Sequence, residues 1–329
     1  MNRPSPLSSL PSHIIHADWS LTPGKRWMGR ANLQPNGRYR VHAPEPVGPL
    51  DQFLMHLKSE SGLGACLLVG FDFPIGLPLA YASQAGITDF LSALSGFGLR
   101  EWGEFYTVAE TADEIRIERP FYPHRPGGTR RIHLVDRLGM ADFNALRRQC
   151  ELPRPERRAA CPLFWTMGAQ QVGKAAICGW RELLTPGLHD PALDLAVWPF
   201  HGPLAGLIQR GRVIIAETYP AEYYPKILTD QEPGAHSTRF SKRNPLSLQQ
   251  CAWRILRWSQ AHNLDLEPAL VQTIETGFIP PSGGEDAFDA IIGLLGMLAV
   301  VLGYQPAGDP GDDEIRRIEG WILGQPTSI

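Results

Sequence analysis

Three apolar stretches of this chain each end at an acidic residue, and this pattern restricts the possible folds more than any other feature. The stretches and their acids are Ile14–Ala17 with Asp18, Ala65–Phe71 with Asp72, and Val213–Ala216 with Glu217. Short apolar runs bounded by turn residues are typical of sheet strands, and a continuous run such as the second is typical of a strand covered on both faces. A carboxylate is costly to bury without a partner. The sequence therefore predicts sheet strands whose ends carry partnered carboxylates.

Two further short strands, Trp27–Ala31 and Arg38–Val41, follow the first one across Pro-Gly and Pro-Asn-Gly turns. Three strands joined by tight turns predict an antiparallel meander. Helical spacing is expected at Leu50–Lys58 and Leu246–His262, and Glu285–Leu302 predicts a nearly all-apolar helix with acids only at its start. We expect an α/β fold in which a mixed sheet, the meander plus parallel strands, carries helices on both faces.

The pattern changes over residues 79–207, which hold most of the aromatic residues and several Pro and Gly breaks. We expect a large, mainly helical insertion there, with helices at Ile87–Ser95, Met140–Cys150 and Gln170–Leu184. Residues 1–78 and 208–329 would form the core domain. Many of the 33 Gly and 30 Pro residues lie next to the acidic strand ends, where they break the element.

The formal net charge is only −3, yet the 31 basic residues comprise 26 Arg and 5 Lys. Residues 116–158 contain 11 Arg, no Lys and 5 acids. Arg makes planar, two-pronged contacts with phosphate, so this segment is either a phosphate-facing surface or a solvated face. Trp102, Tyr106, Phe121 and Tyr122 flank it and would either stack bases or form the core of the insertion.

The five cysteines show no metal-type spacing and no disulfide framework, and Cys66 and Cys251 lie in patterns typical of buried positions. Met1–Ser12 lacks the apolar core of a secretory signal. The longest apolar run, Ala287–Leu302, is too short to span a bilayer. We therefore expect a cytoplasmic protein with no membrane partner.

Acids at neighbouring strand ends converge on the edge of the sheet where α/β folds bind ligands. Converging carboxylates repel one another unless a cation lies between them, and oxygen ligands suit Mg²⁺ or Mn²⁺. Two such ions about 4 Å apart promote phosphoryl transfer, one by activating water and one by stabilising the leaving oxygen. Each acid taken singly could instead cap a turn or a helix.

The order of these motifs resembles a predicted nuclease family of the ribonuclease H-like fold, a bacterial domain-of-unknown-function family. The matching segments are the early strand with Asp18, Asp72-Phe73-Pro74-Ile75-Gly76-Leu77-Pro78, Glu217-Thr218-Tyr219-Pro220-Ala221-Glu222, Ser241-Lys242-Arg243, and Asp286-Ala287-Phe288-Asp289-Ala290. The resemblance spans nearly the whole chain and implies a metal-dependent hydrolase that cleaves phosphodiester bonds in nucleic acid.

The resemblance also implies roles for the matching residues. Asp18 and Asp72 would be the leading metal ligands, Asp289 the third, and Glu217 a ligand or a water-orienting base. Asp286 could replace Asp289, because the two lie three residues apart on one helical face. Among the basic residues, Lys242 and Arg243 would hold phosphates, and Arg254 on the next helix is a further candidate to face the site.

Gly168–Lys174 fits the spacing of a phosphate-binding loop, but Ala175 stands where such a loop needs Ser or Thr. We expect instead a helix N-terminus that presents Gln171 and Lys174 to the cleft. Gly62-Leu63-Gly64 precedes its strand, so no nicotinamide or flavin site is expected.

Two other functions stay open at this stage. One is an ATP-binding kinase or phosphatase of the actin-like group, although that group needs two copies of the core. The other is a non-catalytic module that binds nucleic acid or a partner and retains relict carboxylates.

Overall fold

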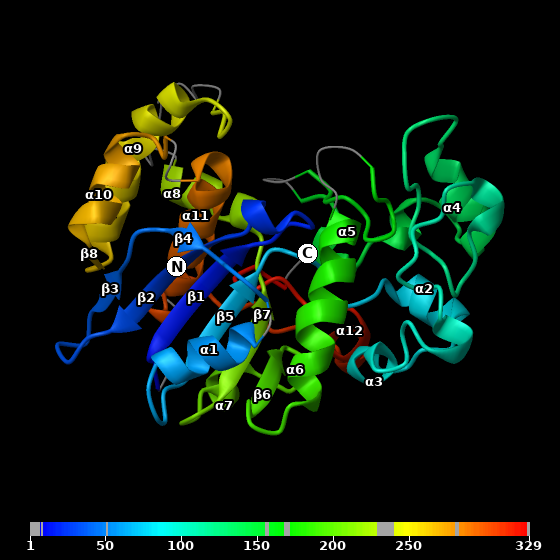
Figure 1. Cartoon of the computed structure of the whole chain (residues 1–329), viewed down its shortest axis with the longest axis horizontal. Coiled ribbons are helices and arrows are strands. Elements are labelled where there is room, and N and C mark those ends of the chain that lie inside the picture. The colour runs from blue at the N-terminus through cyan, green and yellow to red at the C-terminus, as the bar shows by residue number, and fades with distance from the viewer. Residues whose placement is uncertain are drawn as a thin grey trace.

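The computed structural model describes residues 7, 9–50, 52–154, 158–167, 172–228, 240–279 and 283–327. These ranges form an α/β fold around one mixed sheet of eight strands (Figure 1). The strands are β1 His13–Asp18, β2 Trp27–Leu33, β3 Tyr39–Val41, β4 Glu45–Pro46, β5 Leu67–Phe71, β6 Leu195–Trp198, β7 Val213–Glu217 and β8 Asp265–Leu266.

The sheet order is β6-β7-β5-β1-β2-β3-β8, and β4 also pairs with β2. β2 runs antiparallel to both β1 and β3, which confirms the predicted meander. β5 lies parallel to both β1 and β7, so the three acid-ended strands are neighbours with their carboxyl ends at one edge. The short strands β4, β6 and β8 were not predicted from the sequence.

Helices cover both faces of this sheet. Those of the core are α1 Phe53–Glu60, α8 Tyr224–Leu228, α9 Pro245–Ala261, α10 Pro268–Glu275, α11 Gly284–Val301 and α12 Asp313–Ile318. Between β5 and β7 lie α2 Leu79–Gln84, α3 Phe90–Leu94, α4 Arg131–Leu138, α5 Val172–Gly179, a π-helical turn Trp180–Leu184, α6 Thr185–His189 and α7 Leu204–Leu207. Short 3₁₀ turns lie at Pro23–Lys25, Arg100–Trp102, Ala112–Glu114, Asn144–Leu146, Gln149–Glu151 and Pro220–Glu222.

The helix predicted at Met140–Cys150 is wrong, because two 3₁₀ turns occupy this segment. The preceding helix ends at Gly139 in the left-handed conformation. Asp142 then accepts hydrogen bonds from the backbone N–H groups of Asn144 and Ala145. A side chain that bonds to its own backbone in this way competes with helix formation.

Side chains alternate along the central strands and pack into two separate apolar cores, one on each face of the sheet. Ile15, Val69 and Ile215 point to the face covered by α1 and α5, whereas Ile14, Leu68 and Ile214 point to the face covered by α11. The approach of α11 to the sheet is close: a Cβ at Gly293 would lie 2.3 Å from the ring of His16 on β1. His16 is fully buried there, with its Nδ1 3.1 Å from the carbonyl oxygen of Ala290.

The segment 79–207 carries α2, α3 and α4 to one side of the sheet, while α5 lies beside the sheet's edge (Figure 1). Its last part, β6, pairs with β7 and so belongs to the sheet itself. Phe121 and Tyr122 are buried and belong to the apolar core.

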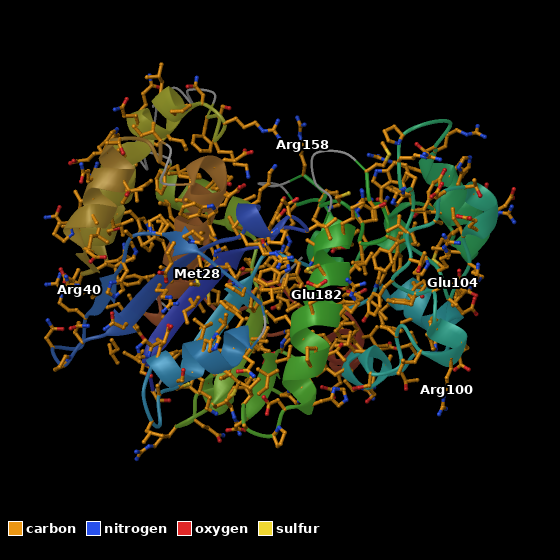
Figure 2. The ribbon with its side chains drawn as sticks, viewed as in Figure 1. Met28, Arg40, Arg100, Glu104, Arg158 and Glu182 are labelled. Carbon is orange, nitrogen blue, oxygen red and sulfur yellow. The ribbon has the colours of Figure 1, made fainter. Side chains whose placement is uncertain are left out.

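Several arginines of residues 116–158 form ion pairs with acids of the stretch just before it, residues 104–113. Arg116 pairs with Glu104, Arg125 with Glu110 and Arg137 with Asp113. Glu104 lies at the outer rim of the molecule, as does the exposed Arg100 (Figure 2). In the part of the chain that the structure describes, no helix is long and apolar enough to cross a membrane.

Candidate active site

The register of the parallel strands places two carboxylates side by side. Ala17 of β1 is the partner of Phe71 of β5, and Asp18 and Asp72 are the next residue along each strand. The backbone N–H of Trp19 donates a 2.6 Å hydrogen bond to Oδ1 of Asp72, which fixes this carboxylate at the strand end. Both acids therefore face the side of the sheet on which α11 packs.

Asp289 joins them from the second turn of α11. It is 4% exposed, and two groups hold its oxygens: the hydroxyl of Tyr224 donates to Oδ1, and the ammonium group of Lys242 forms an ion pair with Oδ2. Tyr224 is fixed in turn by ring contacts with Phe240 and Phe288. Three chain segments that are far apart in the sequence thus bring three carboxylates together.

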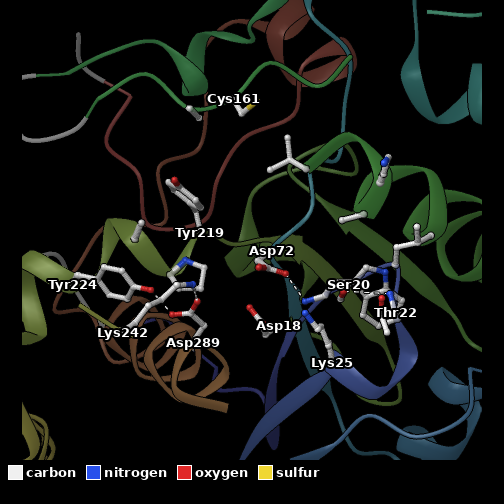
Figure 3. Close-up of a pocket in the computed structure, with 18 residues that line it drawn as sticks. Asp18, Ser20, Thr22, Lys25, Asp72, Cys161, Tyr219, Tyr224, Lys242 and Asp289 are labelled. Carbon is white, nitrogen blue, oxygen red and sulfur yellow. Dashed lines mark hydrogen bonds and ion pairs between the residues drawn. The ribbon is translucent and has the colours of Figure 1, made fainter. Parts of the chain in front are cut away.

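The three carboxylates line a cavity of about 570 Å³ between the strand ends and α5. Figure 3 shows Asp18, Asp72 and Asp289 at its centre, with Lys242 and Tyr224 on one side and Lys25 on the other. The remaining lining residues are Trp19, Ser20, Leu21, Thr22, Ala160, Cys161, Val172, Lys174, Ala175, Tyr219, Pro220 and Ala221. Residues of the segment 79–207 therefore line part of the cavity, and residues near the ends of β1, β5 and β7 and the start of α11 line the rest.

Burial and mutual repulsion change the acidity of this group. Burial raises the pKa of Asp18 well above its ordinary value, and the carboxylates of Asp72 and Asp289 raise it further. Burial also raises the pKa of Asp72 to about 7, although the hydrogen bond from Trp19 opposes the shift. Carboxylates this close do not both ionise near pH 7 unless a cation lies beside them.

The pKa of Asp289 is set by a different combination of neighbours. Burial raises the pKa of Asp289, and the ammonium group of Lys242 and the hydroxyl of Tyr224 oppose the rise. For Lys242 itself, burial lowers the pKa, but the attraction of Asp289 outweighs burial and the pKa rises. Asp289 and Lys242 therefore form an ion pair at neutral pH.

Glu217 does not belong to this group, which corrects the ligand set suggested by the sequence. Its partner in the register is Phe71, one residue before Asp72, so it points to the opposite face of the sheet. Its oxygens accept hydrogen bonds of 2.6 and 2.7 Å from the fully buried Arg148, and the backbone N–H of Ile75 donates another of 2.6 Å. Glu217 therefore binds the insertion to the core.

The segment that follows Asp72 performs a similar structural task. The carbonyl oxygen of Pro74 accepts a 2.7 Å hydrogen bond from the indole of Trp180, and that of Ile75 accepts one of 3.1 Å from Arg148. Gly76 has φ of +133°, and a Cβ there would lie 2.1 Å from the carbonyl oxygen of Glu319. Within this motif only Asp72 lines the cavity; the other residues hold the backbone in place.

The remaining predicted site residues differ in whether they line the cavity. Lys174 on α5 lines the cavity. Asp286 is half-buried one turn before Asp289 and does not line it. Arg243 is exposed and pairs with Glu285 at 3.4 Å, beside a different hollow. Arg254, on α9, stacks over the ring of Trp253 at 4.7 Å and does not line the cavity. Gln171 lies outside the described residues.

Sequence reasoning missed several residues of the site, among them Lys25, Tyr219 and Tyr224. Lys25 lies in the Pro-Gly-Lys turn after β1, a segment noted for its breakers rather than for its charge. The two tyrosines follow the end of β7, on the stretch that leads into α8. None of these three residues belongs to a periodic pattern. Their closeness in the sequence to Asp18 and Glu217 was the one indication that they lie near the site.

The donor set of this cavity suits a hard divalent cation, because three carboxylates from three elements face one space. Among the described residues, however, no group of three or more His, Cys, Asp or Glu side chains is arranged to enclose a metal ion as it stands. The ammonium group of Lys242 neutralises Asp289 instead. A metal ion that binds Asp289 would have to displace this group.

No family model, curated protein or solved structure matches this chain. The chemistry of the site therefore rests on its own residues.

Proposed function

We propose that this protein is a metal-dependent phosphodiester hydrolase that acts on nucleic acid and has a ribonuclease H-like fold. The observation that carries the proposal is the convergence of Asp18, Asp72 and Asp289 on one cavity, where burial raises the pKa of all three. Such a cluster has no evident value for stability, because like charges in a buried space repel one another. Perturbed acids of this kind are concentrated at functional sites.

The sheet supports the same proposal. Its meander leads into parallel strands, and the first strand, its parallel neighbour β5 and the long C-terminal helix supply the acids. This is the arrangement that the resemblance to ribonuclease H-like nucleases implies. The described ranges contain one such sheet, whereas kinases of the actin-like group require two copies, so the nuclease is the better-supported reading.

Asp18, Asp72 and Asp289 would hold Mg²⁺ or Mn²⁺. Bound ions would supply an activated water and neutralise charge on the phosphoryl group. Tyr224 orients Asp289 through its hydroxyl. Lys242 is paired with the same carboxylate in the metal-free arrangement, and release from that pair would leave its ammonium group for a substrate phosphate.

Calorimetric titration with Mn²⁺ tests the metal site. We expect the wild type to bind Mn²⁺, and Asp72→Asn to weaken binding by at least tenfold, since second-shell changes alone weaken metal sites by about 10–100-fold. Asp265→Asn is the matched control, because it removes an exposed carboxylate on β8 that does not line the cavity. This control should bind Mn²⁺ as the wild type does.

Cleavage is tested with purified protein, Mn²⁺ and a panel of single-stranded DNA, single-stranded RNA, duplex, hybrid and branched substrates. We expect at least one substrate to be cut, and Asp72→Asn to abolish the cutting. A protein that neither binds Mn²⁺ nor cleaves any substrate of the panel would be a non-catalytic module with relict carboxylates, and the proposal would fail.

A further inference from the structure

The lysines of this chain are unevenly distributed. Only 5 of its 31 basic residues are lysines. Three of them, Lys25, Lys174 and Lys242, line the cavity of the three carboxylates, and no arginine of the described residues does so. The other two lie elsewhere: Lys58 donates to the carbonyl oxygens of Ala192 and Leu193, and Lys226 lies over the ring of Tyr223. Lysine is therefore concentrated at this cavity in a chain whose basic residues are mostly arginine.

The chemistry of lysine explains such a choice. Its ammonium group is a compact point charge with three rotatable donors, whereas guanidinium is a planar fork suited to fixed pairs. A flexible ammonium group can exchange a carboxylate for a phosphate within the same cavity. Lys242, already on Asp289, is placed for this exchange. Lys25 and Lys174 approach from the turn after β1 and from α5, so the three charges come from separate elements.

The lysines offset the acids of the cavity. Three carboxylates alone would repel a phosphate, but three ammonium groups line the same space. The formal charges of the lining side chains therefore cancel, and the ammonium groups can act as donors to an anion.

The depth of the cavity restricts the form of a nucleic acid that fits. Asp18 and Asp289 are 9% and 4% exposed, so a phosphate must enter the cavity to reach them. Cys161 lies on the side of the cavity away from Asp18 and Asp289 (Figure 3), and Val172 of α5 also lines the cavity. The volume of about 570 Å³ lies in the range of pockets that enclose a single small molecule. Enzymes that act on a base in a recessed pocket take single strands or extrude the nucleotide from the duplex, and we expect a recessed phosphate site to exclude a rigid duplex for the same steric reason.

We infer that Lys25, Lys174 and Lys242 form a phosphate-binding set that admits single-stranded nucleic acid to the carboxylate cavity and excludes an intact duplex. The inference deepens the proposed function and rests on it for the identity of the ligand. It assigns Lys25, a residue outside every motif of the sequence, to substrate binding.

The test measures binding without cleavage. Fluorescence anisotropy with a labelled twelve-residue oligothymidylate, in EDTA and across a salt series, gives both the affinity and its salt dependence. Each of Lys25→Met, Lys174→Met and Lys242→Met should weaken binding by about threefold to tenfold and reduce the salt slope by about 0.7, the value for one phosphate contact on a single strand. Lys58→Met and Lys226→Met are the matched controls and should bind as the wild type does. Lys174→Arg should recover most of the salt slope, because it restores the charge.

An unlabelled blunt duplex that contains the same oligothymidylate provides the second arm. We expect it to compete at least tenfold less well than the single strand at equal nucleotide concentration. The inference is overturned if the three cavity variants bind like the two control variants, or if the duplex competes equally. Anion binding that depends on these lysines in a protein that takes up no Mn²⁺ would support the inference and refute the proposed hydrolase.

Discussion

Replacement of Asp72 by Asn should make the metal-free protein more stable at neutral and alkaline pH. The amide oxygen of Asn can still accept the hydrogen bond from the backbone N–H of Trp19, and its NH₂ group can donate to Asp18. The change therefore removes one charge from a crowded site with little change of shape. Residues that serve function at a cost in stability respond in this direction.

The sign and the size of the change in the free energy of unfolding follow from the pKa of Asp72. Its pKa is about 7 in the folded protein against 3.8 ordinarily, so the folded state holds a proton that the unfolded chain has already lost. The loss of stability caused by ionising Asp72 is absent below its ordinary pKa of 3.8. This loss grows as the pH rises toward 7 and is complete above pH 7. A shift of about three pH units corresponds to about 4 kcal/mol. Because the cavity admits water, we expect about 2 kcal/mol to be realised.

The measurement is thermal or urea unfolding in EDTA at pH 4, 6 and 8. At pH 8 Asp72→Asn should melt about 4 °C above the wild type, and at pH 4 the difference should vanish. Asp265→Asn, an exposed acid on β8, is the control and should stay within about 0.5 kcal/mol of the wild type at each pH. With Mn²⁺ at a hundred times the dissociation constant of the wild type, the wild type gains about 2.7 kcal/mol and a variant that binds tenfold more weakly gains about 1.4 kcal/mol, so the advantage of the variant should fall below about 1 kcal/mol. A variant that is less stable than the wild type at pH 8, or whose advantage persists at pH 4, would refute this account of the site.

Two further changes test how the site is supported. Arg148→Met should lower the free energy of unfolding by about 3–5 kcal/mol in urea titrations, because it leaves the buried carboxylate of Glu217 unpaired; Arg137→Met, which breaks an exposed pair, should cost less than about 1 kcal/mol. Gly293→Ala should destabilise the protein by about 2–3 kcal/mol in the same assay, since the new Cβ meets the pinned ring of His16 and this outweighs the gain of up to about 1 kcal/mol that alanine brings to a helix.

Gly24→Ala is the control for the second change, because a Cβ there has no neighbour within 4 Å. An Arg148→Met protein within about 1 kcal/mol of the wild type would show that the buried pair does not join the insertion to the core. A stabilised Gly293→Ala protein would show that α11 can move away from β1 without loss.

Much of the framework could be predicted from local pattern. The ends of β1 and β5 coincide with Asp18 and Asp72 because apolar runs stop where a charge must meet a partner. The meander follows from its Pro and Gly turns, and α11 from its apolar composition. These features depend on neighbours along the chain, so the order of residues specifies them directly.

The assignment of acids to the site could not be completed in this way. Glu217 and Asp72 both end buried strands, yet a register offset of one residue sends them to opposite faces of the sheet. Asp286 and Asp289 share a helical face, yet only the second reaches the cavity. Strand register and the position of a helix against the sheet depend on how separate elements pack. Neither can be predicted from the spacing of residues along one element.

The amino-acid sequence by itself thus determined the meander, the buried strands with acids at their ends, the apolar C-terminal helix and the scarcity of lysine. Only the tertiary structure decided which acids meet, that Arg148 binds Glu217 away from them, and that three of the five lysines surround the cavity. The reason is physical: local propensities act over a few residues, whereas a site made from β1, β5, α5 and α11 exists only once burial of both faces of the sheet has set their positions.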